Sequence, residues 1–155
     1  MQVDLYQLMR EALKEAEKAY SRGEVPVGAV LAGPEGWIVA KAHNQSVGLN
    51  DPTAHAEILA LREACSLYRN YRLNDALLVV TIEPCLMCMG AAIHARIARL
   101  AFGAFDPKAG AAGSLYNPAG DERLNHRVEV TPGIMEAECR ALMQDFFRAR
   151  RGNPS

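Results

Sequence analysis

The sequence predicts an α/β domain in which helices cover both faces of one sheet. Segments with the apolar character of strands alternate along the chain with segments whose apolar residues recur at helical spacing, an order typical of layered α/β domains. The chain has 155 residues, which suits one domain with a core of ordinary size. It contains no internal repeat, linker or low-complexity segment. We therefore expect residues 1–155 to form a single domain.

The first half of the chain predicts a helix, a hairpin and a second helix. Apolar residues recur at helical spacing over residues 4–21, and Gly23 is well placed to end that helix. The strand-like runs PVGAVLAG and WIVAKAHN follow, separated by the turn signal PEG, and they predict a hairpin. Thr53 can cap the second helix, which we expect over residues 54–68.

The second half predicts three more strands and two more helices. DALLVVTI is apolar throughout, as in a strand buried on both faces. Pro84 marks the first turn of a third helix, CLMCMGAAIHARI. The runs ARLAFGA and HRVEVT are strand-like, and residues 106–125 between them are rich in Gly, Ala, Pro and Asn, as in a loop. GIMEAECRALMQDFFRAR predicts an amphipathic closing helix.

The composition is that of a soluble globular protein. Half of the residues are hydrophobic and 23% are charged. No apolar run approaches the roughly 18 residues that span a bilayer. The N-terminal stretch MQVDLYQLMREALKEAEKAY carries acids throughout and lacks the basic region and apolar block of a secretory signal. We expect a cytoplasmic protein with no membrane contact.

The charge distribution leaves two interpretations of the C-terminal end. The formal net charge of −1 gives no general sign of nucleic-acid binding. The run RARR at 148–151 is either a favourable set of cations at a helix C-terminus or a patch that contacts phosphates. The adjacent Phe146 and Phe147 point in different directions, so one of them could present a stacking face to an RNA base.

Cys85 and Cys88 carry the strongest chemical signal. At positions i and i+3 of a helix their sulfurs share one face, and the free N–H groups of a first turn favour thiolate, the form that binds zinc. Such a pair alone is compatible with structural zinc, catalytic zinc or redox chemistry. The chain lacks a thioredoxin-like pattern, and Cys65 and Cys139 fall in apolar helical runs where core positions are the expectation.

His55 is the best candidate for a third ligand. His94 lies too far along the helix of the cysteines, whereas His55 begins another helix. Side-by-side N-termini of these two helices would give one nitrogen and two sulfur ligands with a fourth position open, which is the catalytic arrangement. Glu57 would then be close enough to take a proton from water and pass it to a substrate. By itself, a glutamate in a first helical turn is more often solvated.

The combination of HAE at 55–57 with PCLMC at 84–88 resembles the zinc-dependent nucleobase deaminases. Several further stretches resemble one family within them, the bacterial tRNA-specific adenosine deaminases. These stretches are EVPVGAV, DPTAHAEI, NYRL, EPCLMC, GAAGSL, NHRVE and DFFRARR. The resemblance spans nearly the whole chain, and the stretches outside the zinc motifs are the ones that point to the tRNA enzymes.

The resemblance implies a cytidine-deaminase-like fold, a three-layer α/β/α sandwich with a central five-stranded mixed sheet. It implies hydrolytic deamination of adenosine to inosine at the wobble position of a tRNA anticodon, in an arginine tRNA with an ACG anticodon. The partners implied are the tRNA anticodon stem-loop and a second copy of the chain, in a homodimer. One Zn²⁺ per subunit would lower the pKa of its water, and the target base would be flipped out to reach it.

The resemblance also assigns roles to single residues. His55, Cys85 and Cys88 match the zinc ligands, and Glu57 matches the proton shuttle. Asn44 matches an asparagine that hydrogen-bonds the target base, and the small Ala56 would let its backbone lie near that base. The positions that line the RNA path are matched by Asp106, Asn125, Phe146 and Arg150.

The chain departs from the family pattern at a few positions. Gln45 and Ser46 stand where a basic residue and a proline are frequent, and Phe105 stands where a basic residue is common. The loop NPAGDERL before Asn125 also differs. These departures leave the zinc chemistry untouched and concern the contacts with the anticodon loop.

Two alternative functions remain open at the level of sequence. A deaminase of a free base such as guanine or cytosine would share the zinc motifs, but NHRVE and DFFRARR disfavour it. A non-catalytic, zinc-stabilised RNA-binding module would need neither Glu57 nor an open metal position, and a chelator would unfold it. The helix CLMCMGAAIHARI is apolar on nearly every side, so a second subunit could supply part of its cover.

Overall fold

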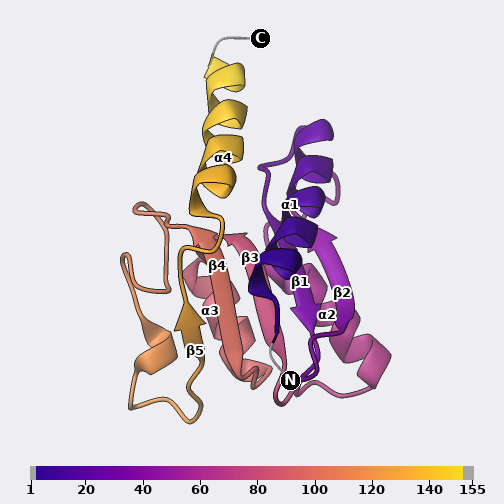
Figure 1. Ribbon diagram of the computed structural model, residues 1–155, viewed down its shortest axis with the longest axis vertical. Helices are drawn as coiled ribbons and strands as arrows, with labels where there is room; N and C mark the ends of the chain where they lie inside the picture. The colour runs from indigo at the N-terminus through magenta and orange to yellow at the C-terminus, as the bar shows by residue number, and fades with distance from the viewer. Residues whose placement is uncertain (1–2, 152–155) are drawn as a thin grey trace.

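The computed structural model describes residues 3–151 and has five strands in one sheet with helices on both faces (Figure 1). The elements are α1 (Leu5–Ser21), β1 (Gly28–Ala32), β2 (Ile38–His43), α2 (Ala56–Tyr68), β3 (Leu77–Ile82), α3 (Leu86–His94), β4 (Arg99–Ala104), the 3₁₀ turn η1 (Pro118–Gly120), β5 (Glu129–Thr131) and α4 (Glu136–Arg151). The predicted three-layer α/β/α sandwich is confirmed.

The sheet is mixed, with the strand order β2-β1-β3-β4-β5. β1 pairs antiparallel with β2, as the hairpin prediction requires, and antiparallel with β3. β3, β4 and β5 pair parallel to one another. Every residue of β1 and β3 is buried, which explains their continuous apolar sequences.

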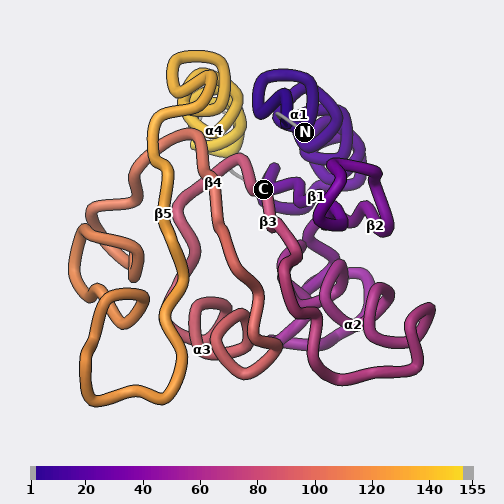
Figure 2. Tube along the Cα trace, turned by 60° about the horizontal axis from the view of Figure 1, so that its bottom comes forward, coloured from indigo at the N-terminus to yellow at the C-terminus, as the bar shows by residue number. Residues whose placement is uncertain are grey.

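The helices form two layers (Figure 2). α1 and α4 lie on one face of the sheet, and α2 and α3 lie on the other. α1 packs directly on β1 at Gly28, where a Cβ atom would overlap the backbone of Ala12 and Ala16. None of the helices in the described part of the chain is long and apolar enough to cross a bilayer.

The predicted starts of two helices were wrong, and in each case the observed N-cap residue is a candidate metal ligand. His55 is the N-cap of α2, whereas Thr53 hydrogen-bonds Asp51. Cys85 is the N-cap of α3, so Pro84 precedes the helix and does not occupy its first turn. Neither His55 nor Cys85 uses its side chain to cap the helix. Both side chains are therefore available for other chemistry.

The other differences concern the ends of elements. α3 ends at His94, three residues before the predicted end. β5 covers only residues 129–131, because the preceding His126 hydrogen-bonds the Ile97 carbonyl through its ring instead of joining the ladder. α4 begins at Glu136, after a turn in which Gly133 and Met135 have positive φ angles.

Candidate active site

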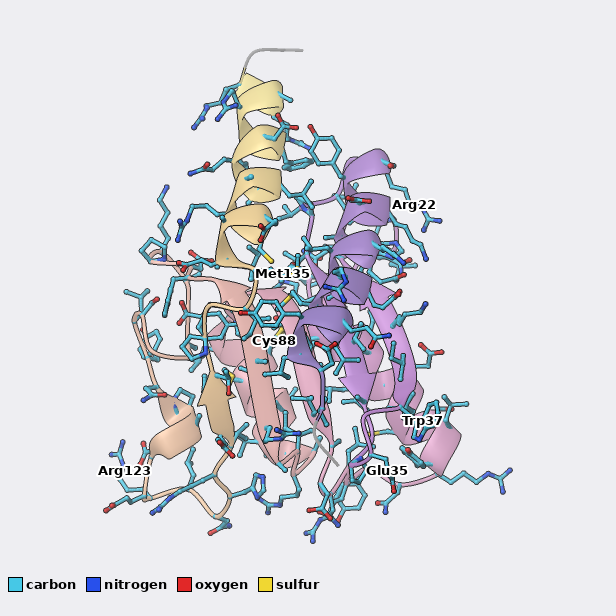
Figure 3. All side chains as sticks on the ribbon, in the orientation of Figure 1. Arg22, Glu35, Trp37, Cys88, Arg123 and Met135 are labelled. Atoms are coloured by element: carbon cyan, nitrogen blue, oxygen red, sulfur yellow. The ribbon has the colours of Figure 1, made fainter. Side chains whose placement is uncertain are left out.

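The three candidate metal ligands meet where α2 and α3 begin. The ligand atoms of His55, Cys85 and Cys88 all lie within 4.8 Å of one another. Nδ1 of His55 is 3.5 Å from Sγ of Cys88 and 3.6 Å from Sγ of Cys85. Figure 3 shows Cys88 in the interior of the molecule, and its side chain is buried. The fold thus brings His55 next to two cysteines that lie 30 and 33 residues further along the sequence.

This donor set fits zinc. One imidazole nitrogen and two sulfurs are the softer ligands that zinc prefers, and three protein ligands leave one position for water or substrate. Among residues 3–151, no fourth His, Cys, Asp or Glu joins the group. The set therefore matches a catalytic zinc site and lacks the fourth ligand of a structural one.

The cluster favours negative charge on one of its two sulfurs, that of Cys85. Hydrogen bonds from Cys88 and His55 outweigh burial and lower the pKa of Cys85 to about 4. The same hydrogen bond to Cys85, together with burial, raises the pKa of Cys88. The contact with Cys85 also raises the pKa of His55. A metal ion bound here would displace the protons of these groups, so its binding releases protons and weakens as the pH falls.

Glu57 lies in the first turn of α2 but is only 3% exposed. Burial raises the pKa of its carboxyl to about 7. A carboxyl group of that pKa can accept a proton and return it at neutral pH, which is what acid–base catalysis requires. The alternative of a solvated helix-start glutamate is excluded by its burial.

Asn44 connects the end of β2 to the start of α2. Its side-chain oxygen accepts the backbone N–H of Ala56 at 2.8 Å. The side chain of Ala56 is fully buried, and its backbone N–H serves to hold the Asn44 side chain in place. The bond leaves the amide N–H₂ of Asn44 as a donor, at a side chain that lines the cavity described next.

A cavity of about 460 Å³ opens beside the metal ligands and Glu57. It brings together most of the predicted site residues: Asn44, His55, Glu57, Cys85, Asp106, Phe146 and Arg150. Val27 and Ile82 add apolar wall. A partly open cavity with apolar sides and a few polar groups is typical of a small-molecule site.

Asn125 is not brought to this cavity. It is exposed, and the neighbouring His126 bonds the carbonyl of Ile97, just before β4 begins. The cavity lies at the opposite end of β4, next to Asp106. A contact between Asn125 and RNA would therefore involve nucleotides outside the cavity.

The α4 residues divide between core and surface. Phe146 is buried, with its ring edge-on to Tyr20 at a centroid distance of 5.5 Å. The Arg150 guanidinium lies 5.1 Å from the Phe146 ring centroid and donates to the Gly23 carbonyl at 3.2 Å. Phe147 remains 42% exposed, so it is the member of this pair whose ring is accessible from outside.

Two buried glutamates at the cavity were not recognised from the sequence. Glu83 accepts the backbone N–H groups of Asp106, Ala112 and Ser114, each at 2.9 Å, and the Ser114 hydroxyl. Burial alone would raise the pKa of Glu83, but these hydrogen bonds outweigh it and hold the pKa below its usual value. Glu83 lies within the stretch EPCLMC, in which only the two cysteines carry a recognisable metal-binding pattern.

Glu24 holds a second loop in the same way. Its carboxylate accepts the backbone N–H groups of Val47 at 3.1 Å and Gly48 at 2.7 Å. The two glutamates thus anchor the loops on either side of the cavity entrance. The sequence signal for Glu24 is slight, because an acid after a helix end is ordinarily exposed.

Comparisons with known proteins agree with this geometry. Residues 3–104 match the family described as the cytidine and deoxycytidylate deaminase zinc-binding region. The tRNA-specific adenosine deaminase of Bacillus subtilis strain 168 is 48% identical over 150 residues, which cover 97% of this chain and 91% of that protein. Its counterpart from Haemophilus influenzae is 49% identical over 144 residues, covering 93% and 83%.

Solved structures show the same likeness. A structure from work on A-to-I editing by tRNA:A34 deaminases at the wobble position superposes with a TM-score of 0.85 at 43% identity, covering 88% of this chain and 98% of that one. The guanine deaminase of Nitrosomonas europaea has a TM-score of 0.77 at 23% identity, covering 94% and 86%, and so shares the fold.

Replacing Glu83 with glutamine should loosen the loop from Asp106 to Ser114. The amide keeps one acceptor oxygen and turns its N–H₂ toward backbone donors, so we expect a loss of about 2 kcal/mol in stability. Hydrogen exchange of the Asp106, Ala112 and Ser114 amides should become faster. Glu122→Gln, an exposed change in the same connection, is the matched control. Unchanged exchange at all three amides would contradict the anchoring role.

Proposed function

This chain belongs to the cytidine and deoxycytidylate deaminase family and, within it, to the tRNA-specific adenosine deaminases, and we propose that it deaminates adenosine to inosine at the wobble position of a tRNA anticodon. The observation that carries the assignment is the 48% identity to a tRNA-specific adenosine deaminase across 97% of the chain. The likeness to guanine deaminase, at 23% identity, is one of fold.

His55, Cys85 and Cys88 hold the zinc ion in this proposal. Their atoms already lie within reach of a common centre. Two thiolates and a neutral imidazole balance the charge of the ion. When bound, zinc supplies a Lewis acid that makes water a nucleophile near neutral pH.

Glu57 moves the protons of the reaction. Its carboxylate accepts a proton from the attacking water and delivers it to the ring nitrogen beside the carbon that bears the amine. It then carries the water's second proton to the departing amine, so that adenosine and water give inosine and ammonia. A pKa of about 7 suits both directions of transfer.

The cavity orients the target base. The Asn44 amide, fixed through its bond to Ala56, is a donor for a base nitrogen. Apolar side chains such as Val27 and Ile82 contact the flat faces of the base and exclude water. A space of about 460 Å³ holds one nucleoside, so the wobble adenosine must leave the stack of the anticodon loop.

Other residues at the cavity and on α4 are proposed to contact the RNA on either side of the target base. Asp106, Phe146 and Arg150 line the cavity, and Arg148 and Arg151 extend a basic surface along the end of α4. We assign the substrate as the anticodon stem-loop of an arginine tRNA with an ACG anticodon. A tRNA substrate fits the cytoplasmic location expected from the sequence.

A homodimer would cover exposed apolar side chains around the cavity entrance and α3. α3 buries Cys88, Met89, Ala92 and Ile93, but Leu86 at its start is half exposed. Further exposed apolar residues lie on the two loops at the entrance: Val47, Leu49, Leu115 and Tyr116. A second subunit packed on this side would cover these apolar side chains, as protein interfaces do.

Replacing Glu57 with glutamine should lower kcat by about 10³-fold, because the amide cannot take or return the proton. Zinc content and thermal stability should stay at wild-type levels. Glu63→Gln, on the exposed side of the same helix, is the control and should retain full activity. Loss of zinc and fold in the Glu57 variant would mean that this residue is structural.

The proposed function is tested on an RNA stem-loop with an ACG anticodon. We expect inosine at the wobble base, measured by mass spectrometry of the digested RNA, and one ammonia released for each inosine formed. A stem-loop with guanosine at the wobble position should remain unchanged. Deamination of free guanine or cytosine with the ACG stem-loop left intact would overturn the assignment to tRNA.

A further inference from the structure

A second cavity adjoins the catalytic one and has no role in the reaction described above. It has a volume of about 910 Å³ and lies between α4 and the turn that follows β4. Val25, Ile82, Asp106, Met143 and Phe147 line both cavities. A chain that places one group in the catalytic cavity can therefore continue directly into this second space, which we call the flanking cavity.

Cationic side chains surround the flanking cavity. Lys108 lies on the turn after β4, and Arg140, Arg148 and Arg151 lie on α4. Arg140 is paired within its own helix, whereas the other three form no ion pair with any residue from 3 to 151. The Asp106 carboxylate already accepts two backbone N–H groups of its own turn. The cavity thus suits a chain of negative charge such as the phosphates of RNA.

Phe105 is an exposed aromatic residue that lines this cavity. Its side chain is 45% exposed, and its ring forms a T-shaped pair with Phe102, with a centroid distance of 5.1 Å and an interplanar angle of 87°. Phe102 is fully buried in β4, so it fixes the orientation of the Phe105 ring. Phe147, on α4, adds a second exposed ring to the same cavity. Exposed rings beside cations are the usual platform for single-stranded nucleic acid.

We propose that Phe105 stacks on the nucleobase next to the target adenosine, while Lys108, Arg148 and Arg151 hold the adjoining phosphates. This inference rests on the proposed tRNA deaminase activity. Stacking requires a base but tolerates any base, because every base has a π face. Stacking depends little on salt, whereas a basic residue at position 105 would contact phosphate and make binding more dependent on salt.

The test is a double-mutant cycle between protein and RNA. Wild-type protein and Phe105→Leu are each titrated with the intact ACG stem-loop and with stem-loops that carry an abasic residue immediately before or immediately after the wobble adenosine. Kd is measured by fluorescence anisotropy. We expect Phe105→Leu to bind the intact RNA about tenfold more weakly. On one of the abasic RNAs, the two proteins should bind equally.

Two further variants separate stacking from a loss of structure. Phe105→Tyr keeps the ring and should retain wild-type Kd on every RNA. Trp37→Leu removes a ring that is 75% exposed at the opposite end of the molecule from α4 and should change nothing (Figure 3). Phe105→Arg should bind the intact RNA with a steeper salt dependence than the wild type.

The outcomes distinguish this inference from the proposed function. If Phe105→Leu loses the same factor on the intact RNA and on both abasic RNAs, or loses nothing on any of them, Phe105 does not stack on a neighbouring base. A wild-type protein that binds the stem-loop but forms no inosine would overturn the proposed function instead. Because the double-mutant cycle measures Kd and not activity, it would still test whether Phe105 stacks on a neighbouring base.

Discussion

The site depends on the meeting of two helix N-termini at one end of the sheet. α2 and α3 begin side by side there, and their N-cap residues are His55 and Cys85. The free N–H groups at a helix start stabilise thiolate, and thiolates in turn neutralise a bound cation. Because the ligands are themselves the caps, neither helix can shift without moving a donor atom. The bond from Ala56 to Asn44 extends the same constraint to the end of β2.

Buried glutamates at this cavity perform different tasks because they receive different numbers of hydrogen bonds. Glu57 is buried with little compensation, so its pKa rises to about 7 and it can exchange protons. Glu83 is equally buried but accepts four hydrogen bonds, which keep its pKa low and make it an anchor for the loop that begins at Asp106. The environment, and not the residue type, divides the work between them.

The sequence predicted the order of the elements and that His55 would lie near Cys85 and Cys88, because these follow from periodicity and from short motifs. Helix caps were less predictable: Thr53 is a good cap by composition, but tertiary contacts place the cap at His55. The anchoring roles of Glu24 and Glu83 depend on loops that are distant in sequence, so no local pattern signals them. Phe105 and residues of α4 line one cavity although they lie far apart in the sequence, so no local pattern signals this either.

The central claim is that His55, Cys85 and Cys88 together hold a zinc ion whose fourth position is left to water or substrate. X-ray absorption spectroscopy at the zinc edge, on the protein loaded with one zinc per chain, tests it directly. The account predicts two sulfur donors, one imidazole nitrogen and one further light atom that changes when the stem-loop is bound. A spectrum with three or four sulfur donors, or with four protein ligands that RNA leaves unchanged, would contradict it.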